Sequence, residues 1–271
     1  EQLPLLANQS PDQFVAELTP LIFNPDVAPK RVSLDDSRDL VLASAANFYE
    51  GVTQPEVEKY YEQLRKTDQA RGEDIRVSYG LNSKVVKENG MVTEKVYNAD
   101  GLYGAAIQQI ISWLGKALPY AETHEQQISI SKLIDYYRTG SLKTWDEYNI
   151  AWVKDQNALV DFVNGFIEVY GDPMAMKGSW ESIVNFKDTE ASKRTVILSD
   201  NAQYFEDNSP VDPAFKKKEV KGVTAKVIIT AQLGGESDPT TPIGINLPNA
   251  NWNSTEPGLK SVTMANITYA Y

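Results

Sequence analysis

The sequence predicts an α+β fold that is helical through about residue 160 and strand-rich after it. In the first 150 residues, apolar side chains recur at the three-to-four-residue spacing of helices. From about Phe162 the apolar spacing changes to period two, which is typical of strands. With 271 residues and 42% hydrophobic side chains, the chain is long and apolar enough to bury a sizeable core.

Capping signals predict the first helices. Ser10-Pro11-Asp12-Gln13 and Thr53-Gln54-Pro55-Glu56 each combine an N-cap residue, a proline at an early helical position and a residue that can close a capping box. After the second signal, one buried stripe is expected from Val57, Tyr60, Tyr61 and Leu64. Between the two signals, helical spacing over Asp36 to Tyr49, ended by Gly51, predicts another helix.

A hairpin and three helices are predicted next. Asn89-Gly90 separates two strand-like segments, as in a tight hairpin. Helical spacing returns over Ile107 to Leu118 and over Ile130 to Tyr137, with Gly140 as a stop, and these two helices should pack together. A third capping box, Thr144-Trp145-Asp146-Glu147, predicts the start of the last of these helices.

The second half should hold most of the strands. Phe166 to Tyr170 reads as a strand with Phe166, Glu168 and Tyr170 on one face. A helix is expected over 188–205. Two further strands, at 223–231 and 261–267, flank a loop at 234–257 that is rich in Gly, Pro and Asn.

Charge and hydropathy exclude several classes of protein. With 37 acidic and 26 basic residues the net charge is -11, so the overall field repels nucleic acid and anionic membranes. No apolar stretch approaches the roughly 18 to 20 residues of a membrane span. We expect a soluble protein with no nucleic-acid or membrane partner, in the cytoplasm, with the periplasm as the alternative.

The chain contains one histidine, His124, and no cysteine. Disulfides, thiolate nucleophiles and cysteine metal sites are therefore impossible. A catalytic zinc takes about three protein ligands, mainly His and Cys, and a serine-type triad would also need His124. Because His124 starts a predicted helix, we interpret it as a surface residue and predict no metal site within this chain.

A peptide-terminus site is the chemistry that the second half favours. Glu168 and Tyr170 share a strand face, and the polar loop Pro242 to Asn249 could lie beside it. A strand edge grips an extended peptide through its backbone, and carboxylate and amide side chains can bind a free α-ammonium group. From the pattern alone, Glu168 could equally be an exposed strand residue and the asparagines turn formers.

Three stretches resemble one known family. Asn164 to Pro173, followed by Lys177-Gly178-Ser179-Trp180-Glu181, resembles the signature of the dipeptidyl peptidase III family of zinc metallopeptidases. Pro242 to Asn249 resembles its second hallmark and Asn266 to Tyr271 its continuation. The resemblance runs in order from about Tyr103 to the C-terminus, more weakly back to residue 1, and is closest to the bacterial branch.

The resemblance implies a two-lobed enzyme that releases dipeptides from the N-termini of short peptides, with a barrel-bearing lobe and a helical zinc lobe. It implies that Glu168 anchors the substrate ammonium group, that Tyr170 lines the same subsite and that Glu181 supports it. The remaining implied roles are backbone pairing by Ile243 and Gly244, binding of the N-terminal end by Asn246 and Asn249, and polarisation of the scissile carbonyl by Tyr271.

The family's zinc motif, H-E-x-x-G-H, is absent from these residues. We therefore expect a fragment of a zinc enzyme, itself inactive, that contributes the substrate-binding lobe from 1–187 and 222–271. Residues 188–221 would form a helical excursion belonging to the zinc lobe, which would be its partner. The alternatives are a non-catalytic peptide-binding or scaffold relative, and a carboxylate hydrolase that uses Glu168 with Asp172 or Glu181.

Overall fold

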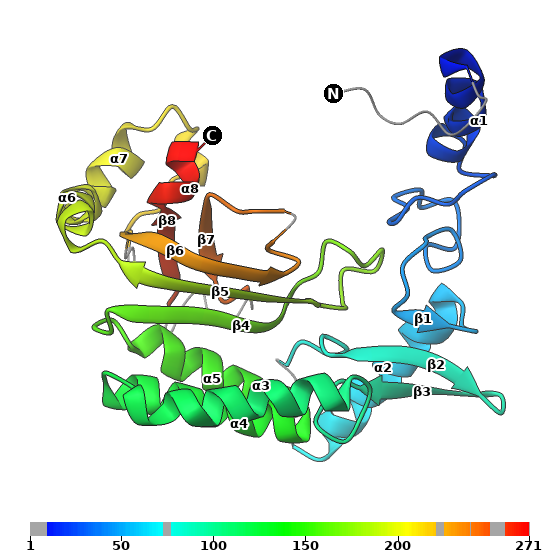
Figure 1. The fold of residues 1–271 in the computed structure, drawn as a ribbon, viewed down its shortest axis with the longest axis horizontal. Helices are drawn as coiled ribbons and strands as arrows, with labels where there is room; N and C mark the ends of the chain where they lie inside the picture. The colour runs from blue at the N-terminus through cyan, green and yellow to red at the C-terminus, as the bar shows by residue number, and fades with distance from the viewer. Residues whose placement is uncertain (1–9, 73–76, 221–224, 239, 250–257, 271) are drawn as a thin grey trace.

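Two sheets and several helices form the part of the chain that the computed structural model describes, residues 10–72, 77–220, 225–238, 240–249 and 258–270 (Figure 1). The helices are α1 (Pro11–Phe23), α2 (Gln54–Ala70), α3 (Gly104–Ala117), η1 (Leu118–Tyr120), α4 (His124–Thr139), α5 (Leu142–Lys154), α6 (Thr189–Asp200), α7 (Ala202–Asn208), η2 (Pro213–Phe215) and α8 (Ala265–Ala270). The strands are β1 (Tyr49–Glu50), β2 (Ser83–Glu88), β3 (Met91–Val96), β4 (Val160–Glu168), β5 (Ser179–Lys187), β6 (Ala225–Gly235), β7 (Gly244–Leu247) and β8 (Lys260–Met264). None of the described helices has the length and apolar content of a membrane span.

The N-terminal part has its own small core. Strands β1, β2 and β3 form a sheet in that order, and α2 packs against it through Val57 and Tyr61, which are buried in one cluster with Val85. The first two of the three predicted capping boxes are present, at Ser10 and Thr53. The Asn89-Gly90 hairpin is also confirmed, with positive φ at both turn residues. We call residues 49–96 the N-terminal unit.

The helix predicted over Asp36 to Tyr49 is wrong. The chain there runs through turns and ends in β1. The carboxylate of Asp39 accepts hydrogen bonds from the backbone N–H groups of Leu42, at 3.0 Å, and Gln54, at 2.9 Å. Asp35 similarly accepts from the N–H of Ser37. Such side-chain acceptors offer the backbone an alternative to helical hydrogen bonds, which the apolar spacing does not reveal.

Helices α3, α4 and α5 form the main helical layer, and the predicted contact between α3 and α4 is confirmed. Gly140 ends α4 in the left-handed region, with φ 73. The third capping box is misplaced. Helix α5 begins at Leu142, and the Ser141 hydroxyl accepts from the N–H of Thr144 at 3.3 Å.

The second sheet has the order β4-β5-β6-β8-β7 and is mixed, because β6 and β8 are parallel while the other neighbours are antiparallel. Strand β5 was not predicted, and β7 lies inside the expected loop at 234–257. The strand expected over 261–267 ends at Met264, and α8 begins at the next residue, Ala265.

The expected alternation along Phe166 to Tyr170 is broken. The register of β4 against β5 shifts between Phe166 and Glu168, and Phe166 and Ile167 are both buried. Such a bulge re-aims the following side chains. Tyr170 consequently lies beyond the end of β4 with its side chain 80% exposed.

The second sheet curls around α5 without closing. One small cavity is lined by residues of all five strands together with Trp152 of α5; its strand residues include Val163, Asn185, Ile228, Ile245 and Val262. In the described residues β4 and β7 are edge strands that do not pair with each other. The barrel implied by the family resemblance is therefore an open, curled sheet here, with α5 packed into its concave side.

Two α-helices, α6 and α7, take the place of the single helix predicted over 188–205, and the short helix η2 follows them. The helical run breaks at Asn201, whose side-chain amide donates to the carbonyl of Ile197 at 2.7 Å. The Ser192 hydroxyl ties α6 to the Val227 backbone of β6. Large apolar side chains on this segment are exposed: Val196, Ile197, Leu198, Tyr204, Phe205, Val211 and Phe215.

Leu133→Ala tests the main core. Leu133 is fully buried on α4, so truncation should lower the free energy of unfolding by about 2 to 5 kcal/mol, measured by urea denaturation. Leu198→Ala is the matched control on α6, where the side chain is 55% exposed, and should change stability by less than about 0.5 kcal/mol. Equal effects of the two substitutions would contradict the assigned core.

Candidate functional site

Glu168 and Tyr170 come together at the end of β4. Glu168 is the last residue of the strand and pairs with Ser179 of β5. The negative charge of Glu168, followed by a hydrogen bond to its carboxylate, raises the pKa of the Tyr170 hydroxyl. Because Tyr170 is largely exposed, the pair is open to a ligand from solvent.

Glu181 adds a second carboxylate, from the neighbouring strand. It pairs with Gly165 on β4 and with Gly235 on β6, and its side chain is 7% exposed. Burial, followed by the negative charges of Glu168 and Glu236, raises the pKa of Glu181 to about 7. Both causes penalise the ionised form, so a cation bound here would remove part of that penalty.

Glu236 completes this group of carboxylates, and sequence reasoning missed it. Arg31 binds Glu236 through two contacts, Nη1 to Oε1 at 3.1 Å and Nη2 to Oε2 at 3.3 Å. The two residues are 205 positions apart, and neither belongs to a local motif that predicts the contact. We call Glu168, Tyr170, Glu181 and Glu236 the acidic site.

The described residues do not fit a zinc ion. They contain no group of three or more His, Cys, Asp or Glu side chains placed to hold a metal. His124 is exposed at the first position of α4. An ion that favours imidazole and thiolate ligands therefore has no set of donors in this part of the chain.

Strand β7 presents an open backbone edge in the described structure. Gly244 pairs with Thr263 and Asn246 with Ser261, while the N–H of Met264 donates to the carbonyl of Ile243 at 2.9 Å. Antiparallel pairs alternate between hydrogen-bonded and non-hydrogen-bonded. The backbone groups of Ile243, Ile245 and Leu247 therefore face β8, and those of Gly244 and Asn246 face away from it.

This alternation separates Ile243 from Gly244, although the family resemblance implies backbone pairing to the peptide for both. The Ile243 carbonyl is engaged by β8, whereas Gly244 has its backbone directed outward. A side chain at Gly244 would place a Cβ 2.8 Å from the Val262 carbonyl oxygen, so this close approach of the strands favours glycine. The Asn246 side chain accepts a hydrogen bond from the Ser261 hydroxyl.

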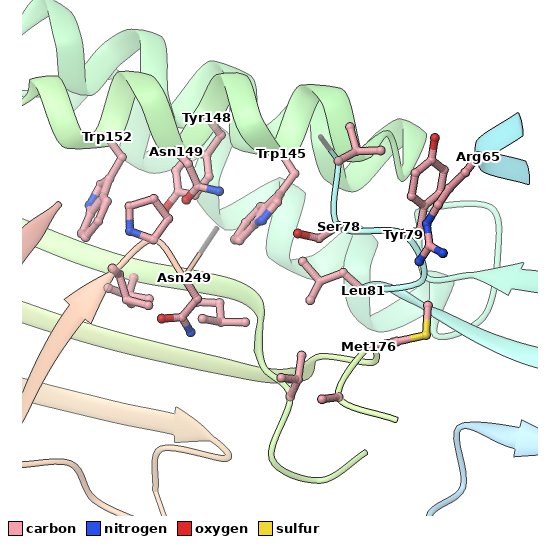
Figure 2. A pocket seen from close by; sticks show the side chains of 17 residues that line it. Arg65, Ser78, Tyr79, Leu81, Trp145, Tyr148, Asn149, Trp152, Met176 and Asn249 are labelled. Carbon is pink, nitrogen blue, oxygen red and sulfur yellow. The ribbon is translucent and has the colours of Figure 1, made fainter. Parts of the chain in front are cut away.

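A cavity of about 320 Å³ lies where α5 faces the end of β7. Figure 2 shows Trp145, Asn149 and Trp152 directed from α5 toward the segment that carries Asn249. Its other walls come from β4, from the segment 77–81 and from Ala175 and Met176 in the β4–β5 loop. The cavity is thus lined by aromatic and apolar side chains together with polar groups, which include Arg65, Ser78 and two amide side chains.

The structure places the predicted residues in two groups. Glu168, Tyr170 and Glu181 belong to the acidic site, whereas Ile243, Gly244, Asn246 and Asn249 lie on β7 or within two residues of its ends. Both edge strands reach the cavity, because Val163 and Ile167 of β4 line it together with Leu247 of β7. Tyr271 lies outside the described residues.

The chain is similar to known peptidases in sequence and in fold. Dipeptidyl peptidase 3 of Dictyostelium discoideum is 31% identical over 172 residues, which is 63% of this chain and 24% of that protein. The structure of dipeptidyl-peptidase III from Corallococcus sp. strain EGB aligns with a TM-score of 0.65 and 23% identity, covering 83% of this chain and 40% of that one. The structure of DPP III from Caldithrix abyssi aligns with a TM-score of 0.69 and 18% identity, covering 97% and 49%.

These relatives are all longer than the chain, which spans 24% of the Dictyostelium protein and less than half of each solved structure. The family model described as peptidase family M49 matches residues 38–271. That match includes the acidic site, β7 and the cavity. The chain therefore belongs to peptidase family M49.

Proposed function

We propose that this chain is the substrate-recognition part of a zinc-dependent dipeptidyl peptidase, and that it binds short peptides by their free N-termini. The observation that carries the proposal is the acidic site, where a buried carboxyl group with a raised pKa lies near Glu168, Glu236 and an exposed tyrosine. Arg31 already pairs with Glu236, and a ligand ammonium group would offer a further positive charge to Glu168 and Glu181.

The open edge of β7 supports binding of an extended chain. Gly244 and Asn246 offer two N–H groups and two carbonyls to an added strand, whatever the side chains of that strand are. In this proposal the backbone pairing assigned to Ile243 passes to Asn246, because the Ile243 carbonyl already accepts from Met264. Asn249 would contact the N-terminal end of the peptide, and the aromatic cavity beside it would receive an apolar side chain.

We further propose that 188–221 packs against the remaining part of a longer enzyme, which would carry the zinc ligands. The exposed apolar side chains of α6, α7 and η2 support this, since a surface of this kind marks an interaction site. The lengths of the relatives leave room for such a part. Tyr271 would act at the scissile carbonyl in the complete enzyme, and the chain alone would hydrolyse nothing.

The alternatives are less well supported. A carboxylate hydrolase that pairs Glu168 with Asp172 would need Asp172 to be free for proton transfer, but its carboxylate accepts from the Tyr49 hydroxyl and from the N–H groups of Met174, Met176 and Lys177. The other pairing, Glu168 with Glu181, would use the acidic site itself, and turnover by the purified chain would favour it. A non-catalytic peptide-binding relative would have the same acidic site. The two differ in the full coding sequence, which encodes the zinc motif for an enzyme and lacks it for a non-catalytic relative.

Glu168→Gln should selectively weaken binding of peptides with a free N-terminus. Removing the charge deletes the proposed ammonium partner, so affinity for an unblocked pentapeptide should fall about tenfold or more in calorimetry. Affinity for the Nα-acetylated form of the same peptide should not change. Glu190→Gln on the exposed face of α6 is the matched control and should leave both affinities unchanged.

Equal affinity of the wild-type chain for the free and acetylated peptides would contradict the proposal. A second measurement tests the expected inactivity. The purified chain with added zinc should release no arylamine from a dipeptidyl arylamide, and turnover would mean that the catalytic group had been overlooked.

The acidic site should also make stability depend on pH through Glu181. Its folded pKa of about 7 lies above the unfolded value near 4.5, so the folded state holds the proton more tightly. The stabilisation of the folded state by this tighter proton binding is fully present below about pH 4.5 and is lost as pH rises through about 7. Glu181→Gln should therefore gain stability relative to wild type by about 2 to 3 kcal/mol between pH 5 and pH 8.

Urea denaturation at the two pH values measures this difference, and Glu190→Gln controls for the general effect of removing a carboxylate. A stability difference between Glu181→Gln and wild type that stays constant from pH 5 to pH 8 would show that Glu181 is not held in a destabilising environment.

Limited proteolysis tests the assignment of 188–221. Without the part that would cover its apolar side chains, this segment should open more readily than the buried central helices. We expect the first cleavages, mapped by mass spectrometry, to fall within 188–221 and well before any cleavage in α3, α4 or α5. Cleavage at equal rates in both regions would count against it.

A further inference from the structure

Residues 171–178, in the loop between β4 and β5, connect the two halves of the acidic site. Tyr170 precedes the loop directly, and Glu181 follows it by three residues. Glu181 pairs with Gly165 before the β4 bulge, whereas Glu168 pairs with Ser179 after it. A shift of this loop at the bulge would therefore move Glu168 and Tyr170 relative to Glu181.

A buried lysine at the end of this loop reaches into the N-terminal unit. The side chain of Lys177 is 0% exposed, and its ammonium group contacts the Tyr61 hydroxyl, the Ser83 hydroxyl at 2.9 Å and Glu94 at 3.8 Å. These partners come from α2, β2 and β3 respectively. Glu94 in turn accepts from Tyr61 and Ser83, each at 2.6 Å.

The backbone of the N-terminal unit is shaped to receive this ammonium group. Gly80 has φ +84, and a Cβ there would lie 2.6 Å from the Tyr61 hydroxyl oxygen and 2.8 Å from Lys177 Nζ. Gly178 donates its N–H to the Leu81 carbonyl at 2.8 Å. Two glycines therefore allow the two segments to touch at the point where Lys177 enters.

The other end of the loop is tied to the same unit. The Tyr49 hydroxyl donates to Asp172 Oδ2 at 2.9 Å. The same carboxylate oxygen accepts from the N–H groups of Met176 and Lys177, both at 2.8 Å. The loop is thus held at Asp172 and at Lys177, in both cases against residues 49–96.

A charge is an inefficient means of filling space in a core. Burying an ammonium group carries a large desolvation penalty, and an apolar side chain of similar volume often stabilises a fold at least as well. Burial, which outweighs the opposing charges of Glu94 and Asp172, lowers the pKa of Lys177 to about 8. The ammonium group instead specifies one conformation of the loop, because its hydrogen bonds are satisfied in that arrangement.

We propose that Lys177 is a positioning residue for the acidic site, through which the N-terminal unit fixes the separation of Glu168 and Tyr170 from Glu181. The effect of Lys177 on peptide binding rests on the proposed function, which assigns the acidic site to peptide N-termini. Its effect on the spacing of the carboxylates does not, and can be tested without a peptide.

The first test is the titration of Glu181, followed by ¹³C NMR of its carboxyl group in the full chain. Lys177→Met keeps the length of the side chain and removes its charge. If the loop relaxes, Glu181 moves relative to Glu168, and its midpoint should shift measurably away from about pH 7. Lys132→Met, which breaks the half-exposed pair with Glu147 on α4 and α5, is the matched control and should leave the midpoint unchanged.

A second variant distinguishes a loss of positioning from a loss of the folded state. Lys177→Met leaves Glu94 partly buried without its cation, so Lys177→Met combined with Glu94→Gln removes both charges. We expect the double variant to unfold cooperatively and still to show the shifted Glu181 midpoint. A folded double variant in which Glu181 titrates as in wild type would overturn the proposal.

The second test is discrimination between a free and an Nα-acetylated pentapeptide. The ratio of the two affinities should fall about tenfold or more in the double variant, because small displacements in a binding site are costly. A purely structural lysine would leave this ratio unchanged in a variant that folds. If the Glu181 midpoint shifts but wild type does not discriminate, the positioning role stands and the proposed function fails.

Discussion

The packing of α5 into the concave side of the second sheet is the constraint on which the remaining architecture depends. Trp152 lines one cavity together with residues of all five strands, and Trp145 lies against Gly165, where a Cβ would come within 2.4 Å of the indole ring. A side chain at Gly165 would therefore displace the helix. With α5 seated there, β4 and β7 end near one another without pairing, which leaves the acidic site and an open strand edge on the same half of the molecule.

Elements with local signals were predictable from the sequence. Capping boxes at Ser10 and Thr53, the Asn89-Gly90 turn and the stop at Gly140 are set by short-range hydrogen bonding and by glycine's freedom at positive φ. Elements that depend on partners were not. Strand β7 has four residues and takes its strand conformation from pairing with β8, and β5 lies between β4 and β6 and pairs with both.

The candidate site divides in the same way. Glu168, Tyr170 and Glu181 fall in one continuous motif, so their proximity follows from two adjacent strands. The contact of Glu236 with Arg31 spans 205 positions, and the bulge after Phe166 depends on how β4 meets β5, so neither leaves a pattern in the sequence. The cage around Lys177 is of this second kind, since it gathers Tyr61, Ser83 and Glu94 from three elements.

Because β7 is short, a second polypeptide can form only a few backbone hydrogen bonds with it. An unpaired edge is a general hazard, because it can template association between copies of a protein. Here Pro242 and Pro248 flank the strand, and only Gly244 and Asn246 turn their backbone groups outward. Four hydrogen-bonding groups are too few to retain a neighbouring polypeptide by main-chain contacts alone. A polypeptide that binds β7 must therefore make an additional contact elsewhere. A short oligopeptide can do so through its charged end, whereas an interior segment of a folded protein has no such end.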